Sequence, residues 1–189
     1  MPAGEKQLLR NRMRRTLAEL TPSYRTEASA SIRNHLHALP AFREARVVYG
    51  ICPMASEPDW LGGILPADKV ICMPRIEGQL LKFVRIESLS GLVEGPFGAV
   101  EPPPGPPAPL PDLVLAPGMA FDAQGNRLGR GAGFFDRFLE SRNYHCIGLA
   151  FACQIIPRVP AYAHDQKMAA IVTENGVMTF PGETPSHRD

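Results

Sequence analysis

Residues 117–136 read P-G-M-A-F-D-A-Q-G-N-R-L-G-R-G-A-G-F-F-D and lie between an apolar strand candidate, Asp112–Ala116, and an amphipathic helix pattern, Phe134–Ser141. Arg127 and Arg130 alternate there with Gly125, Gly129, Gly131 and Gly133. Glycine lets backbone amides approach a ligand closely, and a helix start presents unpaired N–H groups. Two guanidinium groups add paired donors suited to phosphate or carboxylate oxygens. The stretch therefore predicts a strand–loop–helix unit with an anion site in its loop.

The glycine spacing differs from that of two common phosphate-binding loops. The pattern G-x-x-x-x-G-K-[ST] is absent. The run G-x-G-x-G lies about a dozen residues past the strand, whereas the dinucleotide fingerprint follows its strand directly. The alternative interpretation is a glycine-rich turn whose arginines point at water.

Hydrophobic periodicity and proline divide the rest of the chain into elements. Residues 5–20 predict a helix, with an apolar stripe (Leu9, Met13, Leu17, Leu20) beside a basic stripe (Lys6, Arg10, Arg14). A second helix is expected over residues 23–39, between Pro22 and Pro40, with Ala28, Ile32, Leu36 and Leu39 directed inward. Strands are expected at Arg46–Cys52, Lys69–Met73, Gln79–Glu87, 112–116, 145–152 and Ala169–Thr173, and a short helix at Pro58–Leu65.

Short apolar strands that alternate with helices favour a mostly parallel sheet covered on both faces. We expect one α/β domain over residues 1–189, a three-layer α/β/α fold with its core in residues 5–178. Glu101–Pro111 holds seven prolines and predicts an extended polyproline-like surface loop, a stiff connector or, less favoured, a ligand for proline-binding grooves. The polar tail from Gly182 is expected to fray.

Composition narrows the class of protein. Hydrophobic residues make up 44% of the chain, yet no run approaches the roughly 18 apolar residues of a membrane helix. The opening M-P-A-G-E-K lacks the apolar core of a secretory signal, and Glu5 and Glu19 argue against a transit peptide. Cys52, Cys72, Cys146 and Cys153 form no C-x-x-C pair, which indicates reduced thiols and a cytoplasmic location.

Charge is unevenly distributed. Residues 1–50 carry nine Lys/Arg against four Asp/Glu, a balance of +5, and the remainder carries eleven against fifteen, a balance of −4. A basic first quarter suits a polyanionic ligand. Neither interleaved aromatics nor zinc-finger spacing supports nucleic-acid binding.

Six segments, in this order, together resemble the 5-formyltetrahydrofolate cyclo-ligases, also called 5,10-methenyltetrahydrofolate synthetases. They are K-Q-L-L-R at Lys6–Arg10, V-V-Y-G-I-C-P-M-A-S-E ending at Glu57, F-G-A-V-E-P at Phe97–Pro102, the stretch 117–136, G-L-A-F-A-C-Q at Gly148–Gln154 and V-P-A-Y-A-H-D at Val159–Asp165. The resemblance covers residues 5–178 and implies a Rossmann-like fold similar to the NagB/RpiA/CoA-transferase-like group.

The resemblance also implies the chemistry. Such enzymes use ATP and Mg²⁺ to close 5-formyltetrahydrofolate to 5,10-methenyltetrahydrofolate, releasing ADP and phosphate. The formyl oxygen is first phosphorylated, nitrogen 10 then attacks, and phosphate leaves. Positioning and charge neutralisation dominate phosphoryl transfer, so glycines, arginines, a lysine and a metal are the expected groups.

The resemblance assigns roles to residues of this chain. Lys6 and Arg130 would be catalytic. ATP would be bound by Lys6, Gln7, Leu8, Leu9, Arg10, Arg127, Leu128, Gly129, Arg130, Gly131, Ala132, Gly133, Phe134 and Phe135. The folate would be bound by Cys52, Glu57, Arg130, Gly131, Ala132, Gly133 and Phe134, and the metal by Asp136 and Asp165.

Two departures from the family pattern bear on these roles. Ala132 replaces the usual glycine or lysine, so phosphate neutralisation would depend on Arg130 or Lys6. The segment A-S-E-P-D-W after the first strand matches the family pattern less closely than the other segments do.

A monomer with small-molecule ligands is expected, without nucleic acid or membrane. The alternatives are a non-catalytic nucleotide- or folate-binding relative and an enzyme for another formamide.

Overall fold

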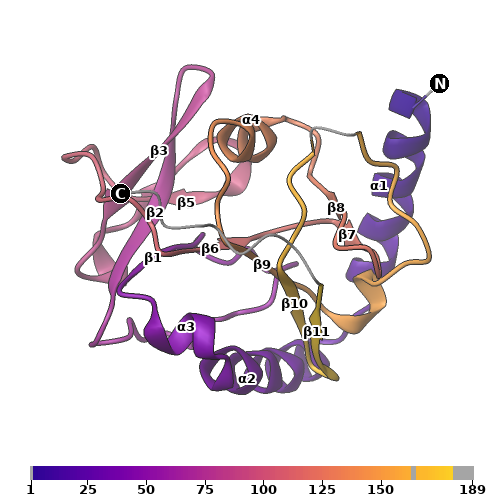
Figure 1. Ribbon diagram of the computed structural model, residues 1–189, viewed down its shortest axis with the longest axis horizontal. Helices are drawn as coiled ribbons and strands as arrows, with labels where there is room; N and C mark the ends of the chain where they lie inside the picture. Colours follow the sequence, from indigo (N-terminus) through magenta and orange to yellow (C-terminus); the bar gives the residue numbers. More distant parts are fainter. Residues whose placement is uncertain (1, 163–164, 181–189) are drawn as a thin grey trace.

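A seven-stranded sheet runs through the centre of the protein (Figure 1). The computed structural model describes residues 2–162 and 165–180. The sheet order is β11-β10-β9-β6-β1-β2-β3. Its strands are β1 (Val47–Tyr49), β2 (Val70–Glu77), β3 (Leu80–Arg85), β6 (Leu113–Ala116), β9 (Cys146–Leu149), β10 (Ala170–Thr173) and β11 (Gly176–Thr179). The five inner strands are parallel and the two edge strands antiparallel, so the predicted mostly parallel sheet is confirmed.

Helices lie on both sides of this sheet. They are α1 (Pro2–Ala18), α2 (Pro22–Ala38), α3 (Pro40–Glu44) and α4 (Phe134–Glu140). Helices α2 and α3 lie below the sheet in Figure 1 and α4 above it, while α1 stands at one end. Pro22 and Pro40 each occupy the first turn of a helix, where the missing N–H has no intrahelical partner to lose. The second helix therefore ends before Pro40 as predicted, and Pro40 also begins α3.

Strand residues alternate between two hydrophobic clusters, as the two-residue period of a strand requires. Val48, Ile71, Leu113, Leu115, Ile147 and Val172 pack on the α2 face, together with Met13 and Leu17 of α1. Tyr49, Cys72, Val114, Ala116, Cys146 and Ile171 pack on the α4 face. Burying an aliphatic side chain of this kind contributes about 1.5–3 kcal/mol, so both faces drive formation of the three-layer fold.

The helix predicted at Pro58–Leu65 is wrong. The backbone there forms turns, with Gly62 at φ 63° and Gly63 at φ 80°. The Asp59 carboxylate accepts hydrogen bonds from the backbone N–H groups of Leu61 and Gly62 at 3.1 and 2.9 Å. Such a local side-chain acceptor offers the backbone an alternative to helical hydrogen bonds, and the glycines favour the left-handed turn.

Several short elements did not emerge from sequence patterns. They are the strands β4 (Val93–Glu94), β5 (Val100–Glu101), β7 (Ala120–Phe121), β8 (Arg127–Leu128) and β11, and the 3₁₀ turns η1 (Leu89–Gly91), η2 (Pro96–Gly98) and η3 (Ala152–Gln154). The strands predicted at 46–52 and 145–152 are shorter than expected, and β2 extends beyond its predicted end to Glu77.

The proline-rich segment is extended, as predicted, and it also lies along the outer edge of the sheet. Pro107 forms an isolated bridge with Val84 of β3, and the Ala108 N–H donates to the Phe83 carbonyl at 3.1 Å. A proline-rich chain at an edge protects the edge strand from pairing with other chains. The tail from Gly182 lies outside the described residues.

Candidate functional site

The site forms where loops leave two neighbouring parallel strands. Strands β1 and β6 pair in parallel, with Val48 opposite Leu113, so the segments that follow them emerge at the same edge of the sheet. Open parallel sheets bind ligands at this carboxyl edge. The segment 50–57 follows β1 and the glycine loop follows β6. This topology explains how Glu57 comes to lie against Arg130.

The glycine loop is more ordered than its composition indicates. Strands β7 and β8 pair within it, Ala120 opposite Leu128, and Asp122 lies in the turn between them. Its carboxylate is fully buried and accepts hydrogen bonds from the backbone N–H groups of Gln124, Asn126 and Val159 and from the Asn126 side chain, at 2.8–3.0 Å. Burial opposes its ionisation, but these donors together outweigh burial and lower the pKa of Asp122. Asp122 thus joins the glycine loop to the segment that begins at Val159.

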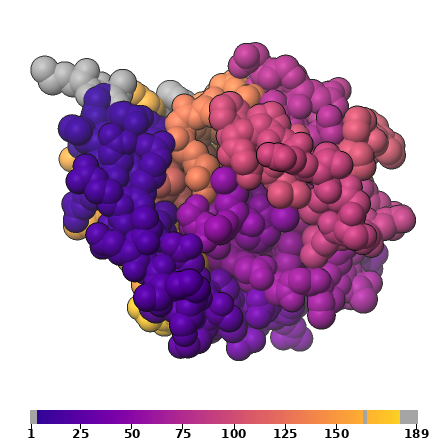
Figure 2. Space-filling model, turned by 180° about the vertical axis from the view of Figure 1, so that it is seen from behind, coloured from indigo at the N-terminus to yellow at the C-terminus, as the bar shows by residue number. Residues whose placement is uncertain are grey.

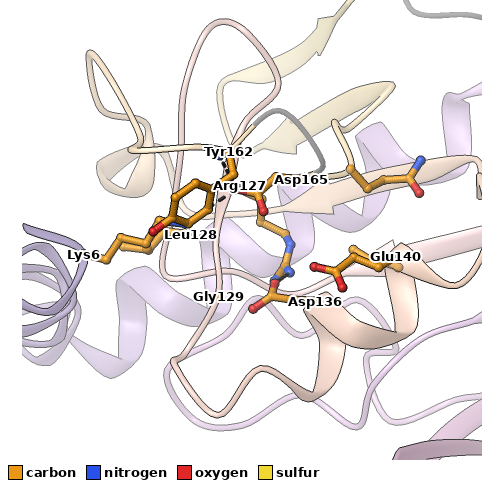
Figure 3. A pocket seen from close by; sticks show the side chains of 10 residues that line it. Lys6, Arg127, Leu128, Gly129, Asp136, Glu140, Tyr162 and Asp165 are labelled. Carbon is orange, nitrogen blue, oxygen red and sulfur yellow. Dashed lines mark hydrogen bonds and ion pairs between the residues drawn. The ribbon is translucent and has the colours of Figure 1, made fainter. Parts of the chain in front are cut away.

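A polar cavity of about 190 Å³ lies between this loop, α1 and α4 (Figure 3). Lys6 Nζ lies 3.5 Å from Asp165 Oδ2 and 4.2 Å from the centre of the Tyr162 ring. Arg127 forms an ion pair with Asp136. Figure 3 shows that cationic and carboxylate side chains from α1 and from the second half of the chain surround this one cavity. The lining residues are Lys6, Arg127, Leu128, Gly129, Asp136, Leu139, Glu140, Tyr162, Asp165 and Gln166.

A second cavity, of about 350 Å³, also borders the glycine loop and is lined mainly by apolar side chains. Glu57 Oε1 accepts from Arg130 Nη2 at 2.7 Å and from Arg130 Nε at 3.0 Å. The exposed ring of Phe97 lies 6.2 Å from that of Phe134, centre to centre, at the cavity wall. An apolar space with two aromatic rings and an anchored guanidinium suits a flat, partly charged ligand.

Cys52 also lines the apolar cavity. Burial first, and then the nearby Asp59 and Glu57 carboxylates, raise the pKa of its thiol. A protonated thiol is a poor nucleophile, so Cys52 contributes shape rather than covalent chemistry.

The two cavities meet at Arg127, Gly129 and Asp136, which line both. The Arg127 side chain is only 4% exposed, whereas that of Asp136 is 41% exposed. Arg10 Nε donates to the Gly129 carbonyl at 2.9 Å and thereby fixes the loop to α1. Burial lowers the pKa of Arg10, against the opposing effect of Asp136. A ligand in either cavity would therefore lie next to the same buried guanidinium, that of Arg127.

Most residues expected at the site from the sequence lie around these cavities. The lining includes Lys6, Cys52, Glu57, Arg127, Leu128, Gly129, Arg130, Gly131, Ala132, Gly133, Phe134, Phe135, Asp136 and Asp165. Gln7, Leu8, Leu9 and Arg10 line neither. Gln7 and Leu8 are exposed, and Leu9 packs against the core.

Other residues at the site were not anticipated. They include Phe97, Glu101, Asp122, Glu140 and Tyr162. Phe97 and Glu101 stand in the F-G-A-V-E-P segment and Tyr162 in V-P-A-Y-A-H-D, so the segments that carry the resemblance contained the signal. Asp122 and Glu140 are single acids whose importance depends on three-dimensional neighbours.

Metal ligands were predicted at Asp136 and Asp165, and both line the polar cavity. Over residues 2–162 and 165–180, no group of three or more His, Cys, Asp or Glu side chains is arranged to hold a metal ion.

Within the same ranges, no helix has the length and apolar character needed to cross a membrane. All four cysteines are free.

Fold and site together define a class: a three-layer α/β protein with a glycine–arginine loop that borders both a polar cavity lined by charged side chains and an apolar cavity. The sequence profile of the 5-formyltetrahydrofolate cyclo-ligase family matches residues 2–174. The chain therefore belongs to the 5-formyltetrahydrofolate cyclo-ligase family, a family of ligases.

Individual relatives agree with this assignment. The chain is 27% identical to the mitochondrial 5-formyltetrahydrofolate cyclo-ligase of Arabidopsis thaliana, over 92% of this chain and 76% of that one. It is also 27% identical to the enzyme of Haemophilus influenzae, over 85% and 92%. The solution structure of 5,10-methenyltetrahydrofolate synthetase from Aquifex aeolicus is similar with a TM-score of 0.81 and 29% identity, over 97% of this chain and 99% of that one.

Proposed function

We propose that this protein catalyses the ATP-dependent cyclisation of 5-formyltetrahydrofolate to 5,10-methenyltetrahydrofolate, with release of ADP and phosphate. One observation carries the proposal: a polar cavity and an apolar cavity share Arg127, Gly129 and Asp136. Two substrates of opposite character, a polyphosphate and a flat bicyclic folate, can then meet at one point.

The nucleotide phosphates occupy the polar cavity. Lys6 and Arg127 line it, and cations beside a glycine-rich loop are the usual means of stabilising phosphate charge. Lys6 is paired with Asp165 and Arg127 with Asp136, so each cation is already oriented toward the cavity. Phosphate oxygens replace these carboxylates as partners of the two cations.

Mg²⁺ suits the carboxylates of the same cavity. Asp136 and Glu140 are one helical turn apart on α4, and Asp165 faces them across the cavity (Figure 3). Mg²⁺ in phosphate sites takes one or two carboxylates and completes its shell with phosphate oxygens and water, so a cluster of three protein ligands is not required. When bound, the metal would neutralise charge on the transferring phosphoryl group. Asp136 and Asp165 are the residues that would hold it.

The folate occupies the apolar cavity. Phe134 faces the Phe97 ring at the cavity wall, whereas Phe135 packs against Phe83 and Phe138 in the core. Glu57 holds the Arg130 guanidinium at the cavity. The formyl oxygen thus lies near Arg127, which borders both cavities. Nitrogen 10 of the same folate lies within the apolar cavity.

Cyclisation proceeds in two steps. The formyl oxygen attacks the terminal phosphorus of ATP and ADP leaves, which converts a weak electrophile into an iminium-like phosphate. Nitrogen 10 then attacks the formyl carbon, the carbon–oxygen bond breaks, and phosphate departs as nitrogen 10 loses its proton. Lys6, Arg127 and Arg130 stabilise negative charge at these steps by fixed electrostatic interactions.

The direct test is formation of the methenyl product, followed by its near-ultraviolet absorbance. Absorbance should rise only when ATP, Mg²⁺ and 5-formyltetrahydrofolate are all present, with one ADP released per product. Absence of product over a broad pH range contradicts the proposal.

The same assay separates the two alternatives. Calorimetric binding of 5-formyltetrahydrofolate or ATP without ADP release indicates a binding protein. ADP release with another formamide, and none with 5-formyltetrahydrofolate, indicates a relative of different substrate. The proposal extends to a monomer in the cytoplasm, and the four free cysteines agree with that reducing compartment. Light scattering of the purified protein tests its oligomeric state.

A further inference from the structure

Glu101 is a buried carboxylate in the apolar cavity. It lies on β5, is 6% exposed and lines the cavity together with apolar residues such as Ile76 and Val100. Among the described residues, none of the Lys, Arg or His side chains forms an ion pair with it. The nearby Arg75 instead lies 3.4 Å from Glu77 and donates to the Pro102 carbonyl. A buried charge without a cation is costly, and such costs concentrate at functional sites.

Glu57, the other buried carboxylate of this cavity, is in a different state. Its Oε1 accepts two hydrogen bonds from Arg130, and its Oε2 accepts one from the Met54 N–H at 2.9 Å. Both oxygens and the charge are therefore engaged by the protein. Glu57 is well placed to position Arg130 and poorly placed to bind the donor edge of a ligand.

Glu101 retains capacity to accept hydrogen bonds. Within residues 2–162 and 165–180, its one donor is the Ile76 N–H, 3.1 Å from Oε1, whereas a carboxylate offers about four acceptor positions. Gly95 makes the position possible, because a Cβ there would lie 2.5 Å from the Glu101 carboxyl carbon. The chain thus keeps a glycine where any side chain would displace this carboxylate.

The same hairpin supplies an aromatic ring. Phe97 lies between β4 and β5, and its φ of 61° is a strained value for a residue other than glycine. With Phe134 it forms one wall of the cavity that Glu101 lines. A flat ring that stacks on this wall, and carries N–H donors on its edge, matches both features.

We propose that Glu101 determines specificity by accepting hydrogen bonds from the N3–H and 2-amino groups of the pterin ring. Two adjacent donors in the plane of a ring fit the two oxygens of a carboxylate. This inference rests on the proposed function, because it assigns one end of that folate substrate. It assigns the pterin end of the folate to Glu101, whereas the sequence placed Glu57, and not Glu101, among the folate-binding residues.

The test combines one substitution with one altered substrate. Glu101→Gln keeps an oxygen that can accept from the Ile76 N–H. It places the NH₂ group of an amide, which is itself a donor, against the N3–H and 2-amino donors of the pterin. Its KM for 5-formyltetrahydrofolate should rise by about tenfold or more, since hydrogen bonds to charged groups contribute at least that much. The KM for ATP and the unfolding temperature should match those of the wild type. Glu94→Gln, an exposed position on the same hairpin, serves as the matched control.

An analogue that carries methyl in place of the 2-amino group completes the test. Wild-type enzyme should prefer the natural substrate by about tenfold, and Glu101→Gln should show little preference. A wild-type enzyme that does not discriminate between the two overturns the proposal, as does an equal loss with both substrates in Glu101→Gln. If the wild type makes no methenyl product, the proposed function fails. Calorimetric binding of both folates to wild type and variant then decides the role of Glu101 separately.

Discussion

Three cation–carboxylate pairs organise the site at the scale of single residues: Lys6 with Asp165, Arg127 with Asp136, and Arg130 with Glu57. At least one partner of each pair is partly exposed to water, and ion pairs that water screens contribute little to stability. Their value here is orientation, since each pair directs a cation into a cavity before a ligand arrives. Substitution of one partner should therefore affect kinetics more than folding.

Glu57→Gln removes the charge that holds Arg130. The KM for 5-formyltetrahydrofolate should rise by about ten- to a hundredfold, the cost of losing a charge-assisted hydrogen bond. The KM for ATP should change by less than about twofold, because Glu57 does not line the polar cavity. Steady-state kinetics with each substrate varied in turn measures both. An equal rise in the two KM values contradicts the division between the cavities.

Asp136→Asn acts at the boundary between the cavities. The expected result is a fall in kcat of about a hundredfold or more, a typical loss when a group that stabilises transition-state charge is removed. The KM for the folate should stay near the wild-type value. Raising the Mg²⁺ concentration should restore part of the rate if Asp136 holds the metal. A variant with wild-type kcat at every Mg²⁺ concentration excludes that role.

At the scale of elements, the site depends on short segments tied together by buried polar groups. Helix α4 has only 7 residues and follows Gly133, whose φ of 73° turns the chain from the loop into the helix. The loop itself is fixed by Asp122 and by the hydrogen bond from Arg10 to Gly129. Packing alone would not hold these segments in one register.

Asp122 makes the stability of this loop depend on pH. Because its folded-state pKa is lowered, its stabilising effect is present above the unfolded-state pKa of about 3.9. The effect is lost as the pH falls through the lower folded-state pKa. Asp122→Asn should unfold at lower urea concentration at pH 7 and show a weaker loss of stability below about pH 4. Urea midpoints measured across this range for both proteins test the assignment, and parallel curves would falsify it.

Tyr24 joins α2 to the turn between β10 and β11. Its hydroxyl donates to the Glu174 carboxylate, which also accepts from the Ala152 N–H at 2.8 Å. The hydrogen bond to Glu174, followed by burial, raises the pKa of Tyr24 to about 12. Tyr24→Phe should lower the free energy of unfolding by about 0.5–1.5 kcal/mol and leave kinetics unchanged, since Tyr24 lines neither cavity. A change in either KM indicates that this contact reaches the site.

At the scale of the whole molecule, the surface of the glycine loop and α4 lies between α1 and the segment around residues 93–105, orange between indigo and pink in Figure 2. Segments from the two halves of the chain thus enclose one site. Ligands that contact several of them should stabilise the entire fold, because binding to the native state alone lowers its free energy.

Thermal unfolding with ligands measures this coupling. ADP with Mg²⁺ and 5-formyltetrahydrofolate should each raise the unfolding temperature, and at 100 times Kd each adds about 2.7 kcal/mol. Removing Mg²⁺ with a chelator should abolish most of the ADP effect and leave the folate effect intact. Loss of both effects on chelation would mean that the two ligands do not occupy separate cavities.

Local patterns were sufficient to predict much of the fold. The apolar stripe of α1, the prolines at the starts of α2 and α3, and the apolar runs of β1, β6 and β10 all act between residues near in sequence. The failure at Pro58–Leu65 has a local cause as well, since the Asp59 carboxylate and two glycines outweigh a weak helical pattern. Short strands such as β7 and β8 carry too few residues to show a period.

The sequence by itself determined the mostly parallel sheet, its helices on both faces and the glycine–arginine loop between a strand and a helix. Only the tertiary structure decided the pairing of Glu57 with Arg130, the link from Asp122 to Val159 and the burial of Glu101 beside Phe97. The reason is physical. Hydrophobic period and turn chemistry act over a few residues, whereas the meeting of distant loops depends on which strands become neighbours in the sheet, and a chain's local patterns are compatible with many strand orders.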